Sequence, residues 1–301
     1  MKKLLLALLF IIPFIMQAQP VDEDPLKAIQ EMDDSTKSEP VIATFKSSRV
    51  INMQSVENVG GGVLDFRIMH RFGEINGGLY QLFGLDQASM RMGFEYGITD
   101  RFMIGIGRST VAKTYDGFLK WKILQQTQGG KKNMPVTLSL FANTAINSLR
   151  YNDPIINDNF AGRMSYTYQI ICGRKFNDKI SLQIVPTYIH RNMVERIIDQ
   201  NDVFALGLGG RYKFTRSLAI NADYFYLLPG QTATDFKDQL SVGVDIETGG
   251  HVFQLHFSNS RGLVENQFIA ETTGDWLKGA VNFGFNLSRV FTINQPRRKA
   301  W

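Results

Sequence analysis

The chain has 301 residues, a net charge of +5 and a single cysteine, Cys172, which excludes an internal disulfide. After residue 19 no run of about 18 apolar residues occurs, which excludes a membrane-spanning helix in that part of the sequence. The 22 Phe, 10 Tyr and 27 Gly are typical of a β protein with many tight turns.

Residues 1–19, MKKLLLALLFIIPFIMQAQ, predict a cleaved secretory signal peptide. Two lysines precede an apolar run from Leu4 to Met16, and Ala18 is a small residue at a suitable cleavage point. An uncleaved anchor is the alternative, but the apolar run is short for a spanning helix. The sequence therefore predicts export.

The next segment, residues 20–40, predicts a short acidic leader in the periplasm. Its last twenty residues hold seven acidic side chains, two lysines and two prolines, a local charge of −5. Subtracting this −5 and the +2 of the signal peptide from the total of +5 leaves +8 on residues 41–301, the predicted β domain. Within that domain, residues 41–53 could form an additional strand or lie inside the fold.

From residue 61 onward apolar and polar side chains alternate with period two. In VLDFRIMHRF (63–72), for example, Leu64, Phe66 and Ile68 share one face, whereas Asp65 and Arg67 lie on the other. Runs of this kind predict about twelve strands, with ten to fourteen possible. The predicted strands are 62–72, 88–98, 102–110, 114–125, 135–146, 160–176, 180–191, 203–214, 218–228, 238–247, 251–259 and 276–291.

Strand length and connection length together predict an antiparallel up-and-down transmembrane β-barrel. Most of the strands match the roughly 9–11 residues that a tilted strand needs to cross a bilayer. Tight turns at 99–101, 177–179, 215–217 and 248–250 would then lie at the periplasmic rim, with both termini. Long loops would lie outside, and these are 73–87, 147–159, 192–202, 229–237 and 260–275.

A secreted β-sandwich or lipocalin-like barrel is the soluble alternative. It would bury every apolar face, yet twelve strands enclose a space too large for side chains alone to fill. A Lys or Arg that faces lipid at the midplane costs about 2–4 kcal/mol, so the charged face should line a lumen. The predicted lumen-lining residues are Asp65, Arg67, Arg91, Glu95, Lys120, Lys122, Arg163, Arg211, Asp245 and His256.

The last predicted strand, KGAVNFGFNLSRVF (278–291), resembles the C-terminal signal by which bacterial outer-membrane barrels are recognised for insertion. That signal closes on an aromatic residue, which predicts Phe291 as the insertion signal. The chain continues to Trp301, the alternative, but Pro296 and the basic run after it are unfavourable in lipid.

Several further motifs lie between residues 41 and 291. They are VIATFKSSRVINMQSVE (41–57), HRFG (70–73), LFGLDQA (82–88), YGITDR (96–101), GIGRS (105–109), KTYDGFLKWKILQQ (113–126) and FGFNLSRVF (283–291). Together they resemble an uncharacterised family of bacterial outer-membrane β-barrel proteins, a domain-of-unknown-function family. The resemblance implies the barrel and its contact with outer-membrane lipid, and it implies no reaction.

The stretch LHFSNSRG (255–262) contains a His-x-Ser-Asn motif that resembles two outer-membrane lipid hydrolases, a phospholipase and a lipid A deacylase. Those enzymes present their catalytic groups to the lipid, whereas here the alternation turns His256 and Ser258 toward the lumen. Asp245 or Glu265 could orient the base, but neither is fixed by spacing. A lipid esterase is therefore the least favoured function.

Two other functions remain, and neither is enzymatic. A basic lumen favours a passive pore for small, possibly anionic, solutes. The alternative is a structural or partner-binding envelope barrel, plugged by its leader or loops. The four histidines are spread over three predicted strands without ligand spacing, so no metal or other cofactor is predicted, and export argues against nucleic acid. The expected partners are lipid, the barrel-insertion machinery, and either solutes or an envelope protein.

Overall fold

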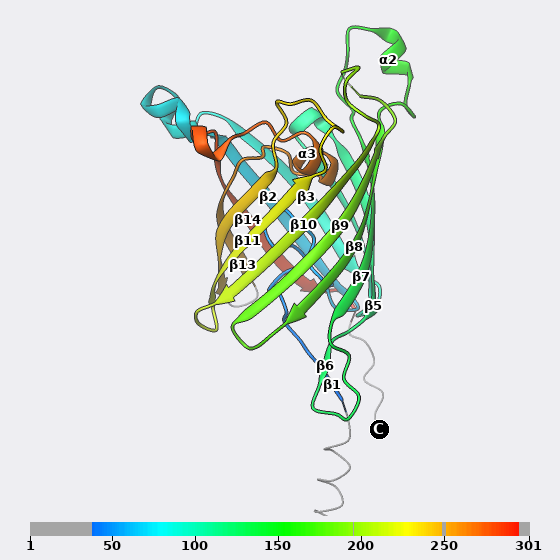
Figure 1. The fold of residues 1–301 in the computed structure, drawn as a ribbon, viewed down its shortest axis with the longest axis vertical. Coiled ribbons are helices and arrows are strands. Elements are labelled where there is room, and N and C mark those ends of the chain that lie inside the picture. The colour runs from blue at the N-terminus through cyan, green and yellow to red at the C-terminus, as the bar shows by residue number, and fades with distance from the viewer. Residues whose placement is uncertain (1–37, 195, 249–250, 295–301) are drawn as a thin grey trace, which may run out of the picture.

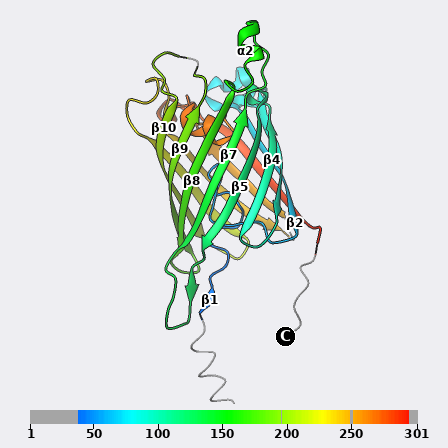
Figure 2. The ribbon, with the colours of Figure 1, turned by 90° about the vertical axis from the view of Figure 1, so that its right-hand side faces the viewer.

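The computed structural model describes residues 38–194, 196–248 and 251–294. The predicted signal peptide, most of the predicted leader and Trp301 lie outside these residues. Figures 1 and 2 show a tall barrel with irregular connections at both ends. No helix in the described ranges is long and apolar enough to cross a bilayer.

Twelve antiparallel strands form one closed barrel, each paired with its neighbours in chain order, and β14 closes the ring on β2. The predicted up-and-down barrel and its strand number are thereby confirmed. The strands are β2 (Val63–Glu74), β3 (Ala88–Gly97), β4 (Phe102–Ser109), β5 (Tyr115–Leu124), β7 (Thr137–Ile146), β8 (Met164–Lys175), β9 (Ile180–Arg191), β10 (Asp202–Lys213), β11 (Leu218–Leu227), β12 (Gln239–Thr248), β13 (His251–Ser258) and β14 (Asn282–Thr292).

The first part of the predicted final strand is a helical turn instead. η3 (Trp276–Lys278) begins after Asp275, whose side chain accepts a hydrogen bond from the Leu277 amide. It ends at Gly279, which has a φ of 69°. This left-handed conformation suits glycine and breaks the extended backbone, so β14 begins only at Asn282.

The two rims of the barrel differ, and we call them the turn end and the loop end. Three tight turns at the turn end have the same hydrogen-bond pattern, in which a side chain accepts hydrogen bonds from the backbone amides two and three residues later. The accepting residues are Thr99, Asn177 and Thr215. The connection 125–136 also lies at this end, where β6 (Thr127–Gln128) pairs with β1 (Glu39–Pro40) below the barrel (Figure 1).

At the loop end the long connections carry the short helices. η1 (Ile75–Gly84) and α2 (Pro154–Asp158) project beyond the barrel, and η2 (Val111–Lys113) lies in the short β4–β5 connection. α3 (Glu265–Ala270), in contrast, folds back into the barrel mouth, and five of its six residues are buried (Figure 1).

Apolar side chains point outward along the strands and charged ones point inward. Phe94, Trp121 and Tyr168 are about half exposed on the outer wall, whereas Arg67 and Lys120 are buried. The soluble alternative, with its apolar faces turned inward, is therefore wrong.

One side of the lumen departs from this alternation. From β4 to β11 several apolar side chains point inward and form a buried cluster with residues of the N-terminal segment and α3. The wall members of this cluster are Met103, Phe118, Phe141, Ile171, Val185, Ile189, Val203, Ala205, Phe225 and Leu227.

Residues 41–59, which we call the plug, contribute no strand to the barrel wall (Figures 1 and 2). Residues 41–43 lie at the turn end, where the Val41 amide donates to the Gln126 carbonyl and Ile42 is exposed, and the rest of the plug lies inside the barrel. The chain of the plug reverses at a tight turn, where the Val50 amide donates to the Met53 carbonyl and the Ser55 amide donates to the Ser48 carbonyl. Most of the plug is buried, including the charged Arg49. Of the two sequence alternatives for residues 41–53, the position inside the barrel is the one observed from residue 44 onward.

Candidate functional site: a filled lumen

The structure places nine of the ten predicted lumen-lining residues on inward-facing strand positions, with buried side chains. They are Asp65, Arg67, Arg91, Glu95, Lys120, Lys122, Arg211, Asp245 and His256. Arg163 lies outside the strands, just before β8 at the loop end, and is only partly buried. Phe291, the predicted insertion signal, lies near the end of β14 and is 40% exposed on the outer wall.

The charged wall residues contact the plug rather than open water. Arg67 donates to the Asp65 carboxylate at 2.7 Å and to the hydroxyl groups of Ser47 and Ser48 at 2.9 and 3.0 Å. The Ser48 hydroxyl in turn donates to Glu95. One wall arginine thus holds two plug residues while its own charge is balanced by a carboxylate of the wall.

Lys120 binds both arms of the plug turn. Its ammonium group donates to the Ser48 carbonyl at 3.1 Å, the Gln54 side-chain oxygen at 3.2 Å and the Ser55 carbonyl at 3.2 Å. These three acceptors match the three N–H donors of the ammonium group. Residues 48 and 55 are therefore fixed relative to each other and to β5.

Asp223, on β11, receives the tip of the plug. Its Oδ2 atom accepts hydrogen bonds from the backbone amides of Ile51, Asn52 and Met53 at 3.1, 2.7 and 3.0 Å. A carboxylate that accepts three amide hydrogen bonds is a strong anchor, because bonds to a charged group are stronger than neutral ones. Asp223 is not among the predicted lumen-lining residues, although Asn221 and Asp223 alternate with apolar neighbours as the residues of the other strands do.

β13, β14 and β2 complete the polar side of the plug site. Gln254 donates to the Val50 carbonyl at 2.6 Å, and Asn286 donates to the Ile51 carbonyl at 3.0 Å. Arg71 donates to the Asn52 side chain. The wall therefore satisfies backbone groups that have no partner in secondary structure, as buried polar atoms require.

Met53 and Val56 anchor the opposite side of the plug at glycines of the wall. A Cβ atom at Gly207 would lie 2.8 Å from the Met53 methyl carbon, and one at Gly173 would lie 2.7 Å from a Val56 methyl. Both distances are shorter than real Cβ contacts, so glycine is what makes room for these two side chains. The plug thus combines polar bonds on one side with apolar packing on the other.

The plug and α3 meet inside the lumen. Arg49 donates to the Asn52 carbonyl at 2.8 Å and lies 3.0 Å from Glu265. Gln54 also donates to Glu265, at 3.1 Å. Through these contacts a segment that enters from the turn end binds a helix that enters from the loop end.

His256 and Ser258 do not form a catalytic pair. The Ser258 hydroxyl lies 3.2 Å from the Asn52 side-chain nitrogen and 2.9 Å from the Ser241 hydroxyl. Both ring nitrogens of His256 are buried and lack a hydrogen-bond partner among the described residues. A nucleophile needs a bonded base and an orienting group, and the two carboxylates considered for that task, Asp245 and Glu265, are bonded elsewhere.

Two cavities of about 340 Å³ each lie at opposite ends of the lumen. The loop-end cavity is lined in part by α3, whereas the turn-end cavity is lined in part by plug residues 43, 45–48 and 57–59. They share no lining residue, and the tip of the plug and α3 occupy the lumen between them.

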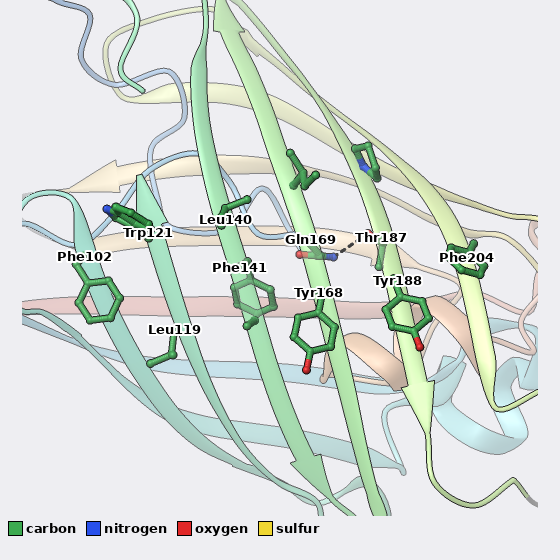
Figure 3. A pocket seen from close by; sticks show the side chains of 13 residues that line it. Phe102, Leu119, Trp121, Leu140, Phe141, Tyr168, Gln169, Thr187, Tyr188 and Phe204 are labelled. Atoms are coloured by element: carbon green, nitrogen blue, oxygen red, sulfur yellow. Dashed lines mark hydrogen bonds between the residues drawn. The ribbon is translucent and has the colours of Figure 1, made fainter. Parts of the chain in front are cut away.

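A third hollow, of about 500 Å³, lies on the outer wall. Figure 3 shows its aromatic and aliphatic side chains, among them Trp121, Tyr168 and Phe204, along neighbouring strands. Its lining is mostly apolar, and the charged groups described above lie inside the barrel. This hollow therefore belongs to the lipid-facing surface and not to the polar site.

Comparison with known proteins identifies a family. The model of a family described as a membrane-bound beta barrel domain (DUF5777) matches residues 45–291. No curated protein matches the chain.

Similar solved structures include the NanC porin (10% identity, 75% of this chain and 98% of that chain, TM-score 0.45). The KdgM porin is another, with 9% identity over 77% of this chain and 99% of that chain and a TM-score of 0.46. A third is the COG4313 outer membrane channel from Pseudomonas putida F1, with 15% identity over 78% of this chain and 98% of that chain and a TM-score of 0.45. The family match covers most of the chain, and the protein belongs to this family of membrane-bound β-barrels.

Proposed function

We propose that the protein is an outer-membrane channel for small solutes whose lumen is closed, in the state described here, by the plug. The observation that carries this proposal is that the barrel wall is complete without residues 41–59. All twelve strands pair with each other, and the plug is held by side chains that point into the lumen. Movement of the plug would leave the ladder of wall hydrogen bonds intact and expose a polar passage.

The charge of the wall favours a weak preference for anions. On the described strands, seven basic and five acidic side chains are buried inside the barrel. The basic ones are Arg67, Arg71, Arg91, Lys120, Lys122, Arg191 and Arg211, and the acidic ones are Asp65, Glu95, Asp116, Asp223 and Asp245. A small positive excess in a narrow lumen raises the local anion concentration.

The orientation and assembly of the barrel form part of the same proposal. We place the turn end in the periplasm, since β1, the first strand of the described chain, and the end of β14, the last one, both lie there (Figure 1). In this orientation, Phe291 would be the residue that the barrel-insertion machinery recognises at the end of the last strand.

A cysteine lock tests whether the plug moves. A Val56 methyl lies 2.7 Å from the position of a Cβ at residue 173, so Val56→Cys with Gly173→Cys should form a disulfide, in a Cys172→Ala background that removes the natural thiol. In planar bilayers we expect no current from the oxidised protein and solute-permeable steps after reduction. Each single-cysteine variant is the control for the effect of substitution. Equal currents before and after reduction would contradict the proposal.

The alternative is a structural or partner-binding barrel in which the plug never leaves. The apolar packing of Met53 and Val56 favours this function, because a plug meant only to swing aside needs no such anchor. Deletion of residues 41–59 separates the two. Silence of the native protein under all voltages, with conductance only after deletion, favours the structural barrel, whereas spontaneous openings of the native protein favour the channel.

A further inference from the structure

The cavity at the loop end has the composition of a binding site. It is lined by the ends of β7, β8 and β9, by the β4–β5 connection and by Asn266 and Gln267 of α3. Its volume of about 340 Å³ lies at the lower end of the roughly 300–1,000 Å³ of small-molecule sites, which suits a ligand the size of a monosaccharide.

Arg191 of β9 and Arg163, which lies just before β8, both line this cavity. Arg191 ends β9 and pairs with Ser165 of β8, and Arg163 lies two residues before Ser165, so both side chains belong to the inward face. Arg191 is only 5% exposed. Within the described residues, the Nε atoms of both arginines are buried and have no hydrogen-bond acceptor.

The remaining contacts of these guanidinium groups leave their charge poorly balanced. Arg163 donates to the Leu149 carbonyl at 3.2 Å, and Arg191 donates to the Gln200 carbonyl at 2.8 Å. The carboxylate of Glu271 lies 3.9 Å from Arg191, at the outer limit of an ion pair. Buried N–H groups of arginine without an acceptor are costly, and an anionic ligand would satisfy them.

The other charged groups at the cavity are engaged elsewhere. Arg196 forms an ion pair with Asp235, and the hydrogen bond from Arg196 lowers the pKa of that carboxyl group, which keeps it ionised. Asp199 accepts a hydrogen bond from the Ala233 amide at 2.7 Å. Among the described carboxylates that line the cavity, Glu271 alone approaches one of the two arginines, and its ion pair with Arg191 leaves Arg163 without a carboxylate partner.

We infer that this cavity captures a small carboxylate-bearing solute, with Arg163 and Arg191 as its carboxylate-binding residues. Arginine suits the task because its planar N–H groups match the geometry of a carboxylate. The inference rests on the proposed channel function and gives it a solute class. It also explains why α3 lines the cavity while its Glu265 binds the plug, since a ligand would then contact the helix that holds the plug in place.

Glucuronate and glucose are suitable probes, because they differ by one carboxylate. With the full-length protein in lipid nanodiscs, titration calorimetry should detect binding of glucuronate and at least tenfold weaker binding of glucose. Arg163→Gln and Arg191→Gln should each weaken glucuronate binding about tenfold or more, as expected for loss of a charge-assisted hydrogen bond. Because Arg163 lies outside the strands, its variant keeps the test valid even if the Arg191 variant folds poorly.

Arg174→Gln is the matched control. Arg174 lies on the same strand as the cavity residue Ser165, but at the turn end, where it stacks on Phe176. Its variant should bind glucuronate as the native protein does. Equal binding of the two sugars, or native affinity in both cavity variants, would overturn the inference. Binding as expected from a protein that never conducts would instead preserve the site and reject the channel.

Discussion

The guanidinium of Arg49 lies 3.0 Å from the carboxylate of Glu265, and neither side chain is exposed to solvent. Arg49 belongs to the plug and Glu265 begins α3, so this ion pair joins the segment that fills the barrel to a loop from the other rim. Removal of one member of a buried pair leaves an uncompensated charge, which is costly. The pair therefore couples the position of α3 to retention of the plug.

Glu265→Gln should loosen the plug. Arg49 would keep its charge, and Glu95, at 3.9 Å, would be its remaining carboxylate partner. Loss of one member of a buried ion pair destabilises the folded state by up to about 3–5 kcal/mol. We expect more frequent openings in single-channel recordings than for the native protein. Glu74→Gln, at the loop end of β2, is the control and should behave as the native protein. Unchanged opening in the Glu265 variant would argue against the coupling.

Gly207→Val should expel the tip of the plug. The new Cβ would approach Met53 at 2.8 Å and the Phe225 ring at 2.7 Å, closer than packed atoms allow. The plug is not part of the wall, so the barrel should still form while residues 41–59 become susceptible to protease. Gly117→Val, on the outer face with no atom nearer than 3.9 Å, should leave the plug protected. If the plug of the Gly207 variant stayed protected from protease, the barrel wall and not the plug would have moved to make room for the valine.

Asp223→Ala should release the turn of the plug without removing the rest of it. Three backbone amides would lose a charged acceptor, and each such bond contributes about 1.5–3 kcal/mol. Hydrogen exchange measured by mass spectrometry should accelerate at residues 51–53 at least tenfold. Asp202→Asn is the control, because Asp202 faces outward at the start of β10 and contacts Tyr188 and His190. Native exchange rates in the Asp223 variant would refute its role as an anchor.

Ser258→Ala should leave the rate of lipid hydrolysis unchanged. The hydroxyl group is bonded to Asn52 and Ser241 rather than to His256, so it lacks a base. Vesicles that contain the native protein or the variant should release fatty acid at the same background rate. A rate that falls in the variant would reopen the possibility of an esterase.

Phe291→Ala should lower the amount of barrel assembled in the outer membrane. Phe291 is the aromatic residue on which the last strand closes, and it lies 5.0 Å from the Arg289 guanidinium, measured to the ring centroid. Heat-modifiable migration on gels would report the folded fraction. Phe283→Ala, at the other end of β14, removes a ring of the same size and serves as the control. Equal loss in both variants would point to packing rather than recognition.

One strand of the sequence also carries a signal of the filled lumen. In β9 the outward Ile184 and Tyr188 are interleaved with inward Val185 and Ile189, so the inner face is apolar in part as well. A strand between lipid and water has no reason to be apolar on its inner face, and such a strand indicates that something packs there. Asp223, in contrast, follows the ordinary alternation, so nothing in the local sequence distinguishes it from the other inward polar residues.

Local sequence determined the wall. Period-two alternation sets which side chains face lipid, and turn residues such as Thr99 and Asn177 set where strands reverse; both depend on residues a few positions apart. Only the tertiary structure decided what fills the lumen. Lys120 and Ser48, or Asp223 and Ile51, meet because the closed ring brings distant segments together around one irregular stretch of chain. No periodicity records such contacts, since the plug has no regular structure of its own and its backbone is satisfied by side chains of many different strands.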